Sequence, residues 1–232
     1  MDAVVMAAGE GTRLRPLTER WPKPVLPIDG RPVLAVLLRE LAAAGCARVW
    51  LVAGHLAEQV EELAGDGSMF GVDVRRVRQP EAFGSADAVR RALDGGARPP
   101  VLVSAADTVF ADGDVGRFAE AFATSGAAGA VAVRTDPGPG PGRKAVRRSG
   151  SKLLRLWDDD PGSVWTPAPL WGLGPSLVER LCLDRPPYEL GNAYQSAIDA
   201  GEPVIAIEIG KTRDLTYPLD LVEENFPYLR ST

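Results

Sequence analysis

The sequence predicts an α/β fold: a Rossmann-like three-layer sandwich with a mostly parallel central sheet and a small lobe in its second half. Short apolar runs alternate with amphipathic stretches along residues 3–104. Such alternation is typical of parallel strands joined by right-handed helical crossovers. The chain has 232 residues, of which 45% are hydrophobic and 25% charged, and this suits a soluble globular domain with a sizeable core.

The first half supplies the clearest elements. Three glycines stand where the predicted helices stop, which is a common place for glycine. The strands are expected at residues 3–6, 49–52, 72–77 and 101–104, and the helices at residues 32–44, 56–64 and 85–93. Parallel sheets of this kind bind their ligands beyond the carboxyl ends of the strands.

The second half begins after a run of alternating proline and glycine at residues 136–142, which cannot form a regular element. We therefore expect one domain, residues 1–232, made of two halves, residues 1–134 and 143–232, joined by a mobile loop at 135–142. The later strands are expected at residues 152–157, 164–173 and 204–209, and the later helices at residues 175–182, 190–200 and 218–225.

Composition narrows the function classes. A formal net charge of −5 argues against a broad nucleic-acid-binding face, although it leaves room for a local basic pocket. Cys46 and Cys182 are far apart and lack metal-ligand spacing. The sequence shows no signal peptide and no apolar run long enough to span a membrane. These features predict a cytoplasmic protein with reduced thiols.

The most informative segment is AAGEGTRLRPL, residues 7–17, which follows the first predicted strand. Gly9 and Gly11 allow close backbone approach to phosphate oxygens, and Arg13 adds a planar donor fork. Lys23 stands between two prolines near the same strand end. The spacing is not that of a P-loop, and Leu14 occupies the place of the third glycine in a dinucleotide fingerprint. These residues predict a nucleoside triphosphate site.

With these residues in view, the chain resembles the sugar-1-phosphate nucleotidylyltransferases. The resemblance lies in four blocks that follow the family's order, at residues 7–34, 79–88, 104–108 and 213–225. It implies a nucleotide-diphospho-sugar transferase fold, with residues 1–134 as the nucleotide-binding half and residues 143–232 as the acceptor-binding half. It also implies Mg²⁺-dependent transfer of a nucleotidyl group to a sugar 1-phosphate, with release of pyrophosphate.

The resemblance assigns roles to individual residues. Arg13 and Lys23 match the catalytic cations that contact the phosphates. Asp107 and Asp214 match the two metal-binding aspartates, although Leu215 and Thr216 depart from the family's usual residues after the second one. Each aspartate could instead cap a turn or helix. The residues expected to bind nucleotide are Ala7, Ala8, Gly9, Glu10, Gly11, Thr12, Gln79, Gly84 and Ser85.

Two of those residues would face the base. Gln79 offers an amide to the hydrogen-bonding edge, and Gly84 permits close approach. A glutamine suits uracil or thymine, although an amide that flips could serve other bases.

The main departure from the family is at the acceptor site. Where the family carries a lysine that binds the acceptor's phosphate, this chain has Asp160, within the run Trp157-Asp158-Asp159-Asp160. Either another cation replaces the lysine, the candidates being Lys144, Arg147 and Lys152, or the acceptor differs. The run could also be a solvated acidic turn.

A cationic acceptor is a further possibility that the acidic run raises. Carboxylates beside tryptophans can recognise a positive charge, so Asp159 and Trp171 are the expected acceptor-binding residues, and phosphocholine or an amino sugar phosphate becomes an alternative acceptor. A non-catalytic nucleotide-binding regulator and a glycosyltransferase of related fold remain open as well. The expected partners are a nucleoside triphosphate and a phosphorylated small molecule, with neither nucleic acid nor membrane, and the family suggests a homo-oligomer.

Overall fold

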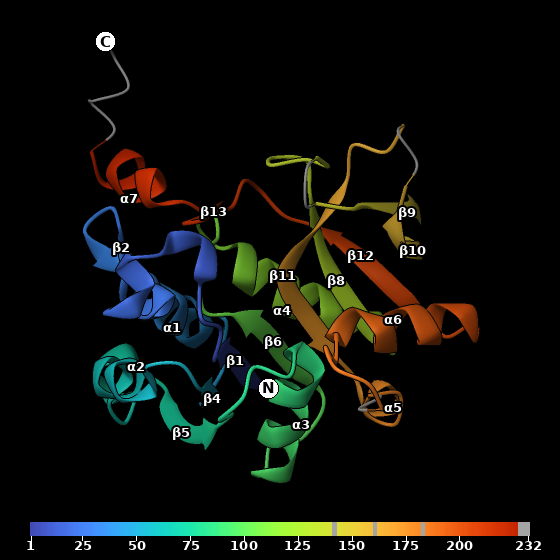
Figure 1. Cartoon of the computed structure of the whole chain (residues 1–232). Coiled ribbons are helices and arrows are strands. Elements are labelled where there is room, and N and C mark those ends of the chain that lie inside the picture. The colour runs from blue at the N-terminus through green and yellow to red at the C-terminus, as the bar shows by residue number, and fades with distance from the viewer. Residues whose placement is uncertain (141–142, 160–161, 182–183, 227–232) are drawn as a thin grey trace.

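The computed structural model describes residues 1–140, 143–159, 162–181 and 184–226. A nine-stranded sheet runs through the molecule in the order β5-β4-β1-β6-β11-β8-β12-β10-β9 (Figure 1). Its strands are β1 (Asp2–Ala7), β4 (Arg48–Ala53), β5 (Asp73–Arg78), β6 (Val101–Ala105), β8 (Gly129–Arg134), β9 (Ala145–Ser149), β10 (Lys152–Asp158), β11 (Thr166–Leu173) and β12 (Val204–Glu208).

The two ends of this sheet have different topologies. Strands β5, β4, β1 and β6 are all parallel. From β6 onward, β11 pairs antiparallel with both β6 and β8, β12 returns parallel to β8, and β10 and β9 close the sheet with antiparallel pairs. The predicted α/β sandwich is confirmed, with its parallel region in the first half and a mixed extension in the second.

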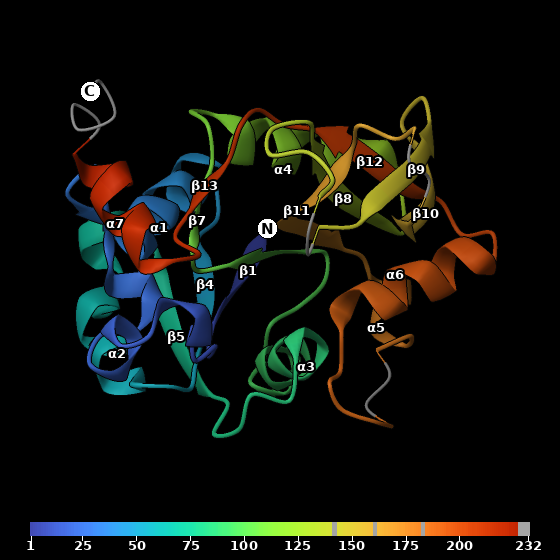
Figure 2. The same ribbon diagram turned by 45° about the horizontal axis from the view of Figure 1, so that its top comes forward.

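Helices cover both faces of the sheet (Figures 1 and 2). Side chains alternate along β1, so that Ala3 and Val5 join one core cluster and Val4 joins the other. The first cluster is completed by α1 (Val33–Ala43), α2 (Ala57–Ala64) and α4 (Asp114–Ser125). The second is completed by α3 (Ser85–Asp94), α5 (Pro175–Val178) and α6 (Leu190–Asp199).

Most predicted elements are confirmed to within two residues at each end, and α7 (Pro218–Asn225) has the predicted bounds. The predicted helix at residues 175–182 is wrong in length, because after Val178 the backbone forms i→i+3 hydrogen bonds, from Arg180 N to Leu177 O (3.1 Å) and from Leu181 N to Val178 O (3.2 Å). Cys182 lies outside the described residues. Helix α4 and strands β8 and β9 are additional elements that the sequence patterns did not predict.

Two small sheets lie beside the main one. Strand β2 (Pro27–Ile28) pairs with β3 (Arg31–Pro32), and β7 (Thr108–Val109) pairs antiparallel with β13 (Arg213–Asp214). The second pair carries the chain from the far half of the molecule back to the end of β6.

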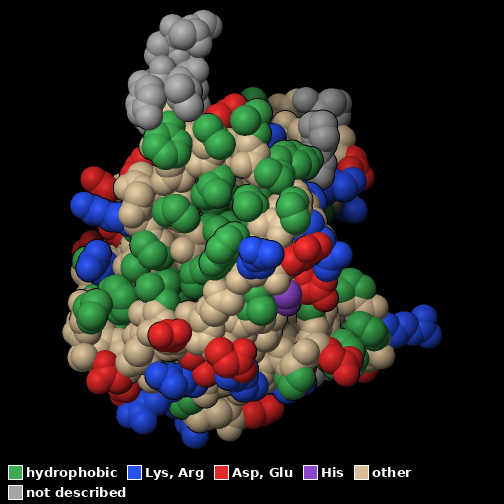
Figure 3. All heavy atoms as spheres, turned by 60° about the vertical axis from the view of Figure 1, so that its left-hand side comes forward, with side chains coloured by type: hydrophobic (Ala, Val, Ile, Leu, Met, Phe, Trp, Pro, Cys, Tyr) green, Lys and Arg blue, Asp and Glu red, His purple; other side chains and the backbone are tan. Residues whose placement is uncertain are grey.

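Helix α7 lies at the edge of the molecule and fully buries none of its residues. It leaves Leu219, Val222 and Phe226 exposed, on a face where Figure 3 shows many hydrophobic side chains. No helix in the described ranges combines the length and apolar character needed to cross a membrane.

Candidate active site

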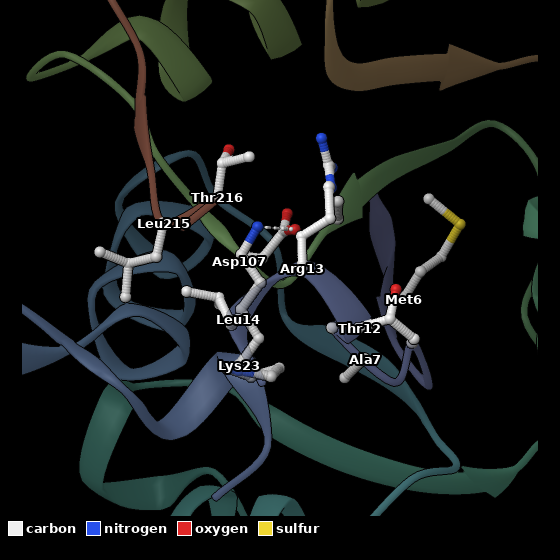
Figure 4. Close-up of a pocket in the computed structure, with 13 residues that line it drawn as sticks. Met6, Ala7, Thr12, Arg13, Leu14, Lys23, Asp107, Leu215 and Thr216 are labelled. Atoms are coloured by element: carbon white, nitrogen blue, oxygen red, sulfur yellow. Dashed lines mark hydrogen bonds and ion pairs between the residues drawn. The ribbon is translucent and has the colours of Figure 1, made fainter. Parts of the chain in front are cut away.

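A pocket of about 360 Å³ opens at the carboxyl ends of β1 and β6 (Figure 4). The predicted glycine loop forms one wall, and the segment after β13 forms another. The lining residues are Met6, Ala7, Gly9, Gly11, Thr12, Arg13, Leu14, Lys23, Pro24, Ala105, Asp107, Leu215 and Thr216. Four of the predicted nucleotide-binding residues, Ala7, Gly9, Gly11 and Thr12, therefore line the pocket.

The glycine loop is held by one left-handed residue and one buried anchor. Gly11 has φ +62°, and a Cβ there would lie 2.9 Å from the Thr18 methyl group. The Thr18 hydroxyl donates to the Gly11 carbonyl at 2.9 Å. Leu14 is buried in a small apolar cluster beneath the loop. This packing leaves Arg13 free to extend into the pocket, as Figure 4 shows.

Two loop residues predicted to bind nucleotide do not line the pocket. Ala8 is buried, and its carbonyl accepts from the backbone N–H of His55 at 3.4 Å. Glu10 forms an exposed ion pair with Arg15 at 3.0 Å. The His55 ring hydrogen-bonds the Thr18 carbonyl at 2.7 Å, so the only histidine braces the loop.

Lys23 and Asp107 line the pocket, and Asp214, which lines the neighbouring cavity, lies within reach of the same lysine. The Lys23 Nζ lies 2.6 Å from Asp107 Oδ2 and 3.8 Å from Asp214 Oδ2. The lysine side chain is only 12% exposed. One cation thus already bridges two carboxylates that are more than a hundred positions apart in the chain.

The β7–β13 pair explains how Asp214 reaches this position. Its register sets Asp214 opposite Thr108, the residue after Asp107. Leu215 is completely buried in the cluster that also holds Leu14, and Thr216 donates its hydroxyl to Asp214 Oδ2 at 3.0 Å. The Leu-Thr sequence that departs from the family pattern therefore anchors and orients the aspartate.

The donor set fits Mg²⁺. Magnesium in phosphate-transfer sites is commonly held by one or two carboxylates, with waters and substrate phosphates completing the shell. Asp107 and Asp214 supply two such carboxylates within reach of one cation. Within the described ranges no group of three or more His, Cys, Asp or Glu side chains could hold a metal, so the phosphates would have to complete the coordination.

The predicted base-reading residues, Gln79 and Gly84, are not among the residues that line this pocket. Gln79 is only 3% exposed, and its Nε2 donates to Asp87 Oδ2 at 2.8 Å and to the Gly84 carbonyl at 3.1 Å. Both partners can only accept from the amide, so they fix its orientation and leave Oε1 as the atom that can accept a hydrogen bond. Arg91 Nε also donates to Asp87 Oδ2, at 2.7 Å.

Gly84 and Ser85 join the two halves of the molecule. Gly84 has φ +118°, and a Cβ there would lie 2.5 Å from the Tyr188 carbonyl oxygen. Ser85 donates to Glu189 Oε2 at 2.9 Å and accepts from the Leu190 backbone N–H at 2.8 Å. A loop of the nucleotide-binding half is thereby tied to the segment that enters α6.

The two described aspartates of the acidic run, Asp158 and Asp159, are both paired with cations. Asp159 is 83% exposed and forms an ion pair with Lys144, which together with attraction by Arg155 lowers the pKa of the Asp159 carboxyl. Asp158 accepts from Arg147 Nη2 at 3.1 Å. Two cations that the sequence offered as substitutes for the family lysine are thus engaged by the neighbouring aspartates. Asp160 lies outside the described residues.

Trp171 lines a separate pocket of about 260 Å³, which Asp159 does not reach. Trp157, Ser85 and Glu189 are among its other lining residues. Trp165 is placed elsewhere, with the Arg148 guanidinium 4.0 Å from its ring centroid. The structure therefore separates the two predicted acceptor-binding residues.

Arg134, which sequence reasoning missed, lies at the end of β8 and lines a cavity beside the active site with Arg13 and Asp214. An arginine that ends an otherwise apolar strand, Gly129–Arg134, is the signal that could have found it.

With this geometry established, the comparisons with known proteins define the class. The model of the nucleotidyl transferase family matches residues 2–140, which is more than half of the chain and includes the glycine loop, Lys23 and Asp107. The chain belongs to this family.

Its relatives include enzymes of nucleotide-sugar chemistry. A glucose-1-phosphate thymidylyltransferase of Streptomyces griseus is 29% identical over 100% of this chain and 67% of its own length. A low-salt glycan biosynthesis nucleotidyltransferase of Haloferax volcanii is 25% identical over 97% of this chain and 65% of its own length. The chain thus spans about two thirds of these two relatives.

The fold is also found among solved structures. A Bacillus anthracis structure described as a glucose-1-phosphate thymidylyltransferase in complex with sucrose superposes with a TM-score of 0.85 at 20% identity. The match covers 100% of this chain and 96% of that one, which supports the fold assignment for both halves.

Proposed function

We propose that the protein is an Mg²⁺-dependent nucleotidylyltransferase that joins a nucleoside triphosphate to a sugar 1-phosphate, giving a nucleoside diphosphate sugar and pyrophosphate. The observation that carries the proposal is the convergence of Lys23, Asp107 and Asp214 beside the glycine loop and Arg13. Family membership and the names of the relatives support the same chemistry.

The reaction is an in-line displacement at the α-phosphorus. An oxygen of the acceptor's phosphate forms the new P–O bond, the bond to the bridging oxygen breaks, and pyrophosphate leaves with that electron pair. Because the attacking oxygen is already anionic, no strong general base is needed. The protein's work is to align two polyanions and stabilise charge in the transition state.

The residues divide this work. The backbone of Gly9 and Gly11 lets the phosphates approach closely, and Arg13 supplies a mobile cation that finds no described partner before substrate binds. Lys23 is held in the pocket by Asp107 and contacts the phosphates from a fixed position. Asp107 and Asp214 would hold Mg²⁺, which supplies charge neutralisation and orientation for the triphosphate.

The orientation of Gln79 supports a preference for certain bases. With Nε2 committed to Asp87 and Gly84, Oε1 presents an acceptor. The N3–H of uracil and thymine can donate to it, whereas N3 of neutral cytosine has no proton and would face it as a second acceptor. The ring N–H of guanine and the amino groups of cytosine and adenine can donate as well. UTP or dTTP is the proposed nucleotide, in keeping with the match between glutamine and uracil or thymine expected from the sequence.

A cationic acceptor is the second candidate, and the Trp171 pocket favours it. Trp157 and Trp171 line the pocket together with the Glu189 carboxylate, which forms no ion pair with any described residue. Two indoles and one unpaired carboxylate suit an ammonium group. The ion pairs of Asp158 and Asp159 weigh against the acidic run itself as the recognition element.

Pyrophosphate release tests the proposal and separates the candidates. The protein would be assayed with Mg²⁺ and UTP, dTTP, CTP, GTP or ATP against hexose 1-phosphates, amino-sugar 1-phosphates and phosphocholine. Release with a hexose 1-phosphate that is unaffected in a Glu189→Gln variant supports the leading function. Release with phosphocholine alone, lost in that variant, supports the second. Nucleotide binding without release for any acceptor would favour the non-catalytic regulator.

A further inference from the structure

A second cavity, of about 540 Å³, lies beside the active-site pocket and shares Arg13 and Thr216 with it. Its other walls come from the end of β8, the loop that follows, and α7. The lining residues are Arg13, Arg134, Pro137, Arg143, Asp214, Thr216, Tyr217, Asp220 and Glu224. Because Asp214 is among them, the cavity adjoins the proposed metal site.

Arg134 is the unusual member of this lining. It is only 7% exposed, and burial lowers the pKa of its guanidinium, against the opposing attraction of Asp214. One nitrogen donates to the Thr212 hydroxyl, but the buried Nε has no hydrogen-bond partner. A buried arginine normally pairs with an anion, since an unpaired charge away from water is costly.

Among the described residues, no carboxylate forms a hydrogen bond or ion pair with Arg134. Asp214 and Asp136 attract its guanidinium, but the carboxylates that line the cavity have other partners. Asp220 Oδ2 accepts from the backbone N–H groups of Thr216 and Tyr217, at 2.7 and 2.8 Å, and so caps α7. Glu224 pairs with Arg213. Asp214 accepts from Thr216 and faces Lys23.

The arginines of the cavity have N–H groups that no described carboxylate takes up. Arg143 donates through Nε to the Gly138 carbonyl at 2.9 Å, which fixes it at the rim with its remaining N–H groups available. Arg13 enters from the glycine loop. Three arginines therefore surround one cavity, and planar guanidinium groups suit the oxygens of a phosphate.

We propose that this cavity, with Arg134 at its centre, binds a phosphate group and takes the place of the lysine that the family carries where this chain has Asp160. The phosphate is that of the acceptor, because the glycine loop and Lys23 already provide for the triphosphate on the other side of Arg13. This inference rests on the proposed function and names the residues that give it an acceptor phosphate site.

The test is an Arg134→Met variant, which keeps the unbranched stem but removes the charged guanidinium, beside Arg134→Lys and the matched control Lys152→Met. Lys152 is exposed on β10, and it is one of the three cations named from the sequence as possible replacements for the family lysine. Titration calorimetry would measure the affinity for Mg²⁺–UTP, for pyrophosphate and for inorganic phosphate, and turnover would give KM for the acceptor. Thermal unfolding would confirm that each variant is folded.

We expect Arg134→Met to raise the acceptor KM at least tenfold and to abolish competition by inorganic phosphate, with nucleotide affinity changed less than twofold. Arg134→Lys should recover part of the loss, and Lys152→Met should match the wild type. Equal loss of acceptor, UTP and pyrophosphate affinity would overturn the assignment to the acceptor, because the cavity would then bind the triphosphate. Unchanged phosphate affinity and KM in folded Arg134→Met would overturn the inference, as would an acceptor KM raised by Lys152→Met instead.

The binding measurements test the phosphate site even if the proposed reaction is not observed. If no acceptor supports turnover, inorganic phosphate should still bind the wild type and protect it thermally, but not Arg134→Met. If Arg134→Met does not fold, the same comparison with Arg134→Lys applies, with phosphate affinity expected to fall because a lysine offers a single point charge in place of the planar fork.

Discussion

The two ends of the active-site region differ in how their charges are balanced. At the metal end, Lys23 lies between Asp107 and Asp214, so every charge has an opposite neighbour before any ligand binds. At the arginine end, the buried Arg134 has an unpartnered Nε, and the nearby acids are engaged by Arg213 and by backbone amides. The difference indicates that the first end is preassembled, whereas the second is complete only with a bound anion.

The largest expected effect is on turnover, when a carboxylate is removed from the Lys23–Asp107–Asp214 group. Asp107→Ala should reduce pyrophosphate release by about 10³-fold or more, because it removes both a metal ligand and the partner that positions Lys23. Thermal unfolding should change little, since Asp107 is partly exposed. Asp112→Ala, an exposed aspartate nearby, is the matched control. An Asp107→Ala variant with wild-type turnover would refute the metal assignment.

Gly84→Ala should sever the link between the two halves. The new Cβ would meet the Tyr188 backbone at 2.5 Å, at a residue with φ +118°, and we expect a loss of about 2–4 kcal/mol in the free energy of unfolding. Gly150→Ala, at φ +58° with open space around it, should lose only about 1 kcal/mol. Denaturant titrations of both variants measure the difference, and equal losses would contradict the proposed close contact.

A smaller effect, on the preference between nucleotides, should test whether Asp87 orients Gln79. Asp87→Ala removes one of the two acceptors that fix its amide, so the preference for UTP over CTP should fall by about tenfold, the value of one hydrogen bond. Asp87→Asn should retain the preference, because a single amide oxygen can accept from both Gln79 and Arg91. Calorimetric affinities for the two nucleotides test this, and a preference unchanged in Asp87→Ala would exclude the orienting role.

The smallest effect concerns the ion pairs that hold β13 beside the site. Arg213 donates to Asp29 and lowers the pKa of that carboxyl. Because the pKa of Asp29 is lower in the folded state than its ordinary value of 3.8, the ion pair stabilises the fold above pH 3.8. This contribution is lost as the pH falls through the folded-state pKa. Asp29→Asn should therefore lower the free energy of unfolding by at most about 1 kcal/mol at pH 7, because Asp29 is largely exposed.

The pH dependence supplies the control for that prediction. The difference between Asp29→Asn and the wild type should shrink as the pH falls through the lowered pKa of Asp29 and disappear once the wild-type carboxyl is protonated as well. A difference that persists at low pH would mean that the pair contributes through packing instead of charge.

The contrast between the two ends also explains what could be predicted from the sequence. The glycine loop, Lys23 and Asp107 lie close to strand ends in a regular βα alternation, so local patterns sufficed to place them. Asp214 needed the family resemblance, because its position depends on the two-residue β7–β13 pair and on burial of Leu215.

Other features of the fold and the site could not be predicted from local sequence patterns. Arg134 ends an otherwise apolar strand that is buried along its whole length, and this pattern marks the position, but its place beside Arg13 and Asp214 depends on tertiary structure. Helix α4 carries Gly116 in its first turn, and glycine is unfavourable inside a helix. The division into nucleotide-binding and acceptor-binding halves, the mobility of residues 135–142, the cytoplasmic location and self-association stay predictions.

The most direct test of the central claim is pyrophosphate release by the wild type and Asp107→Ala with Mg²⁺, UTP or dTTP, and a panel of sugar 1-phosphates. We expect release that requires both the nucleotide and the acceptor, stops when Mg²⁺ is chelated, and is absent in the variant. Release that occurs without an acceptor, or that survives in Asp107→Ala, would contradict it.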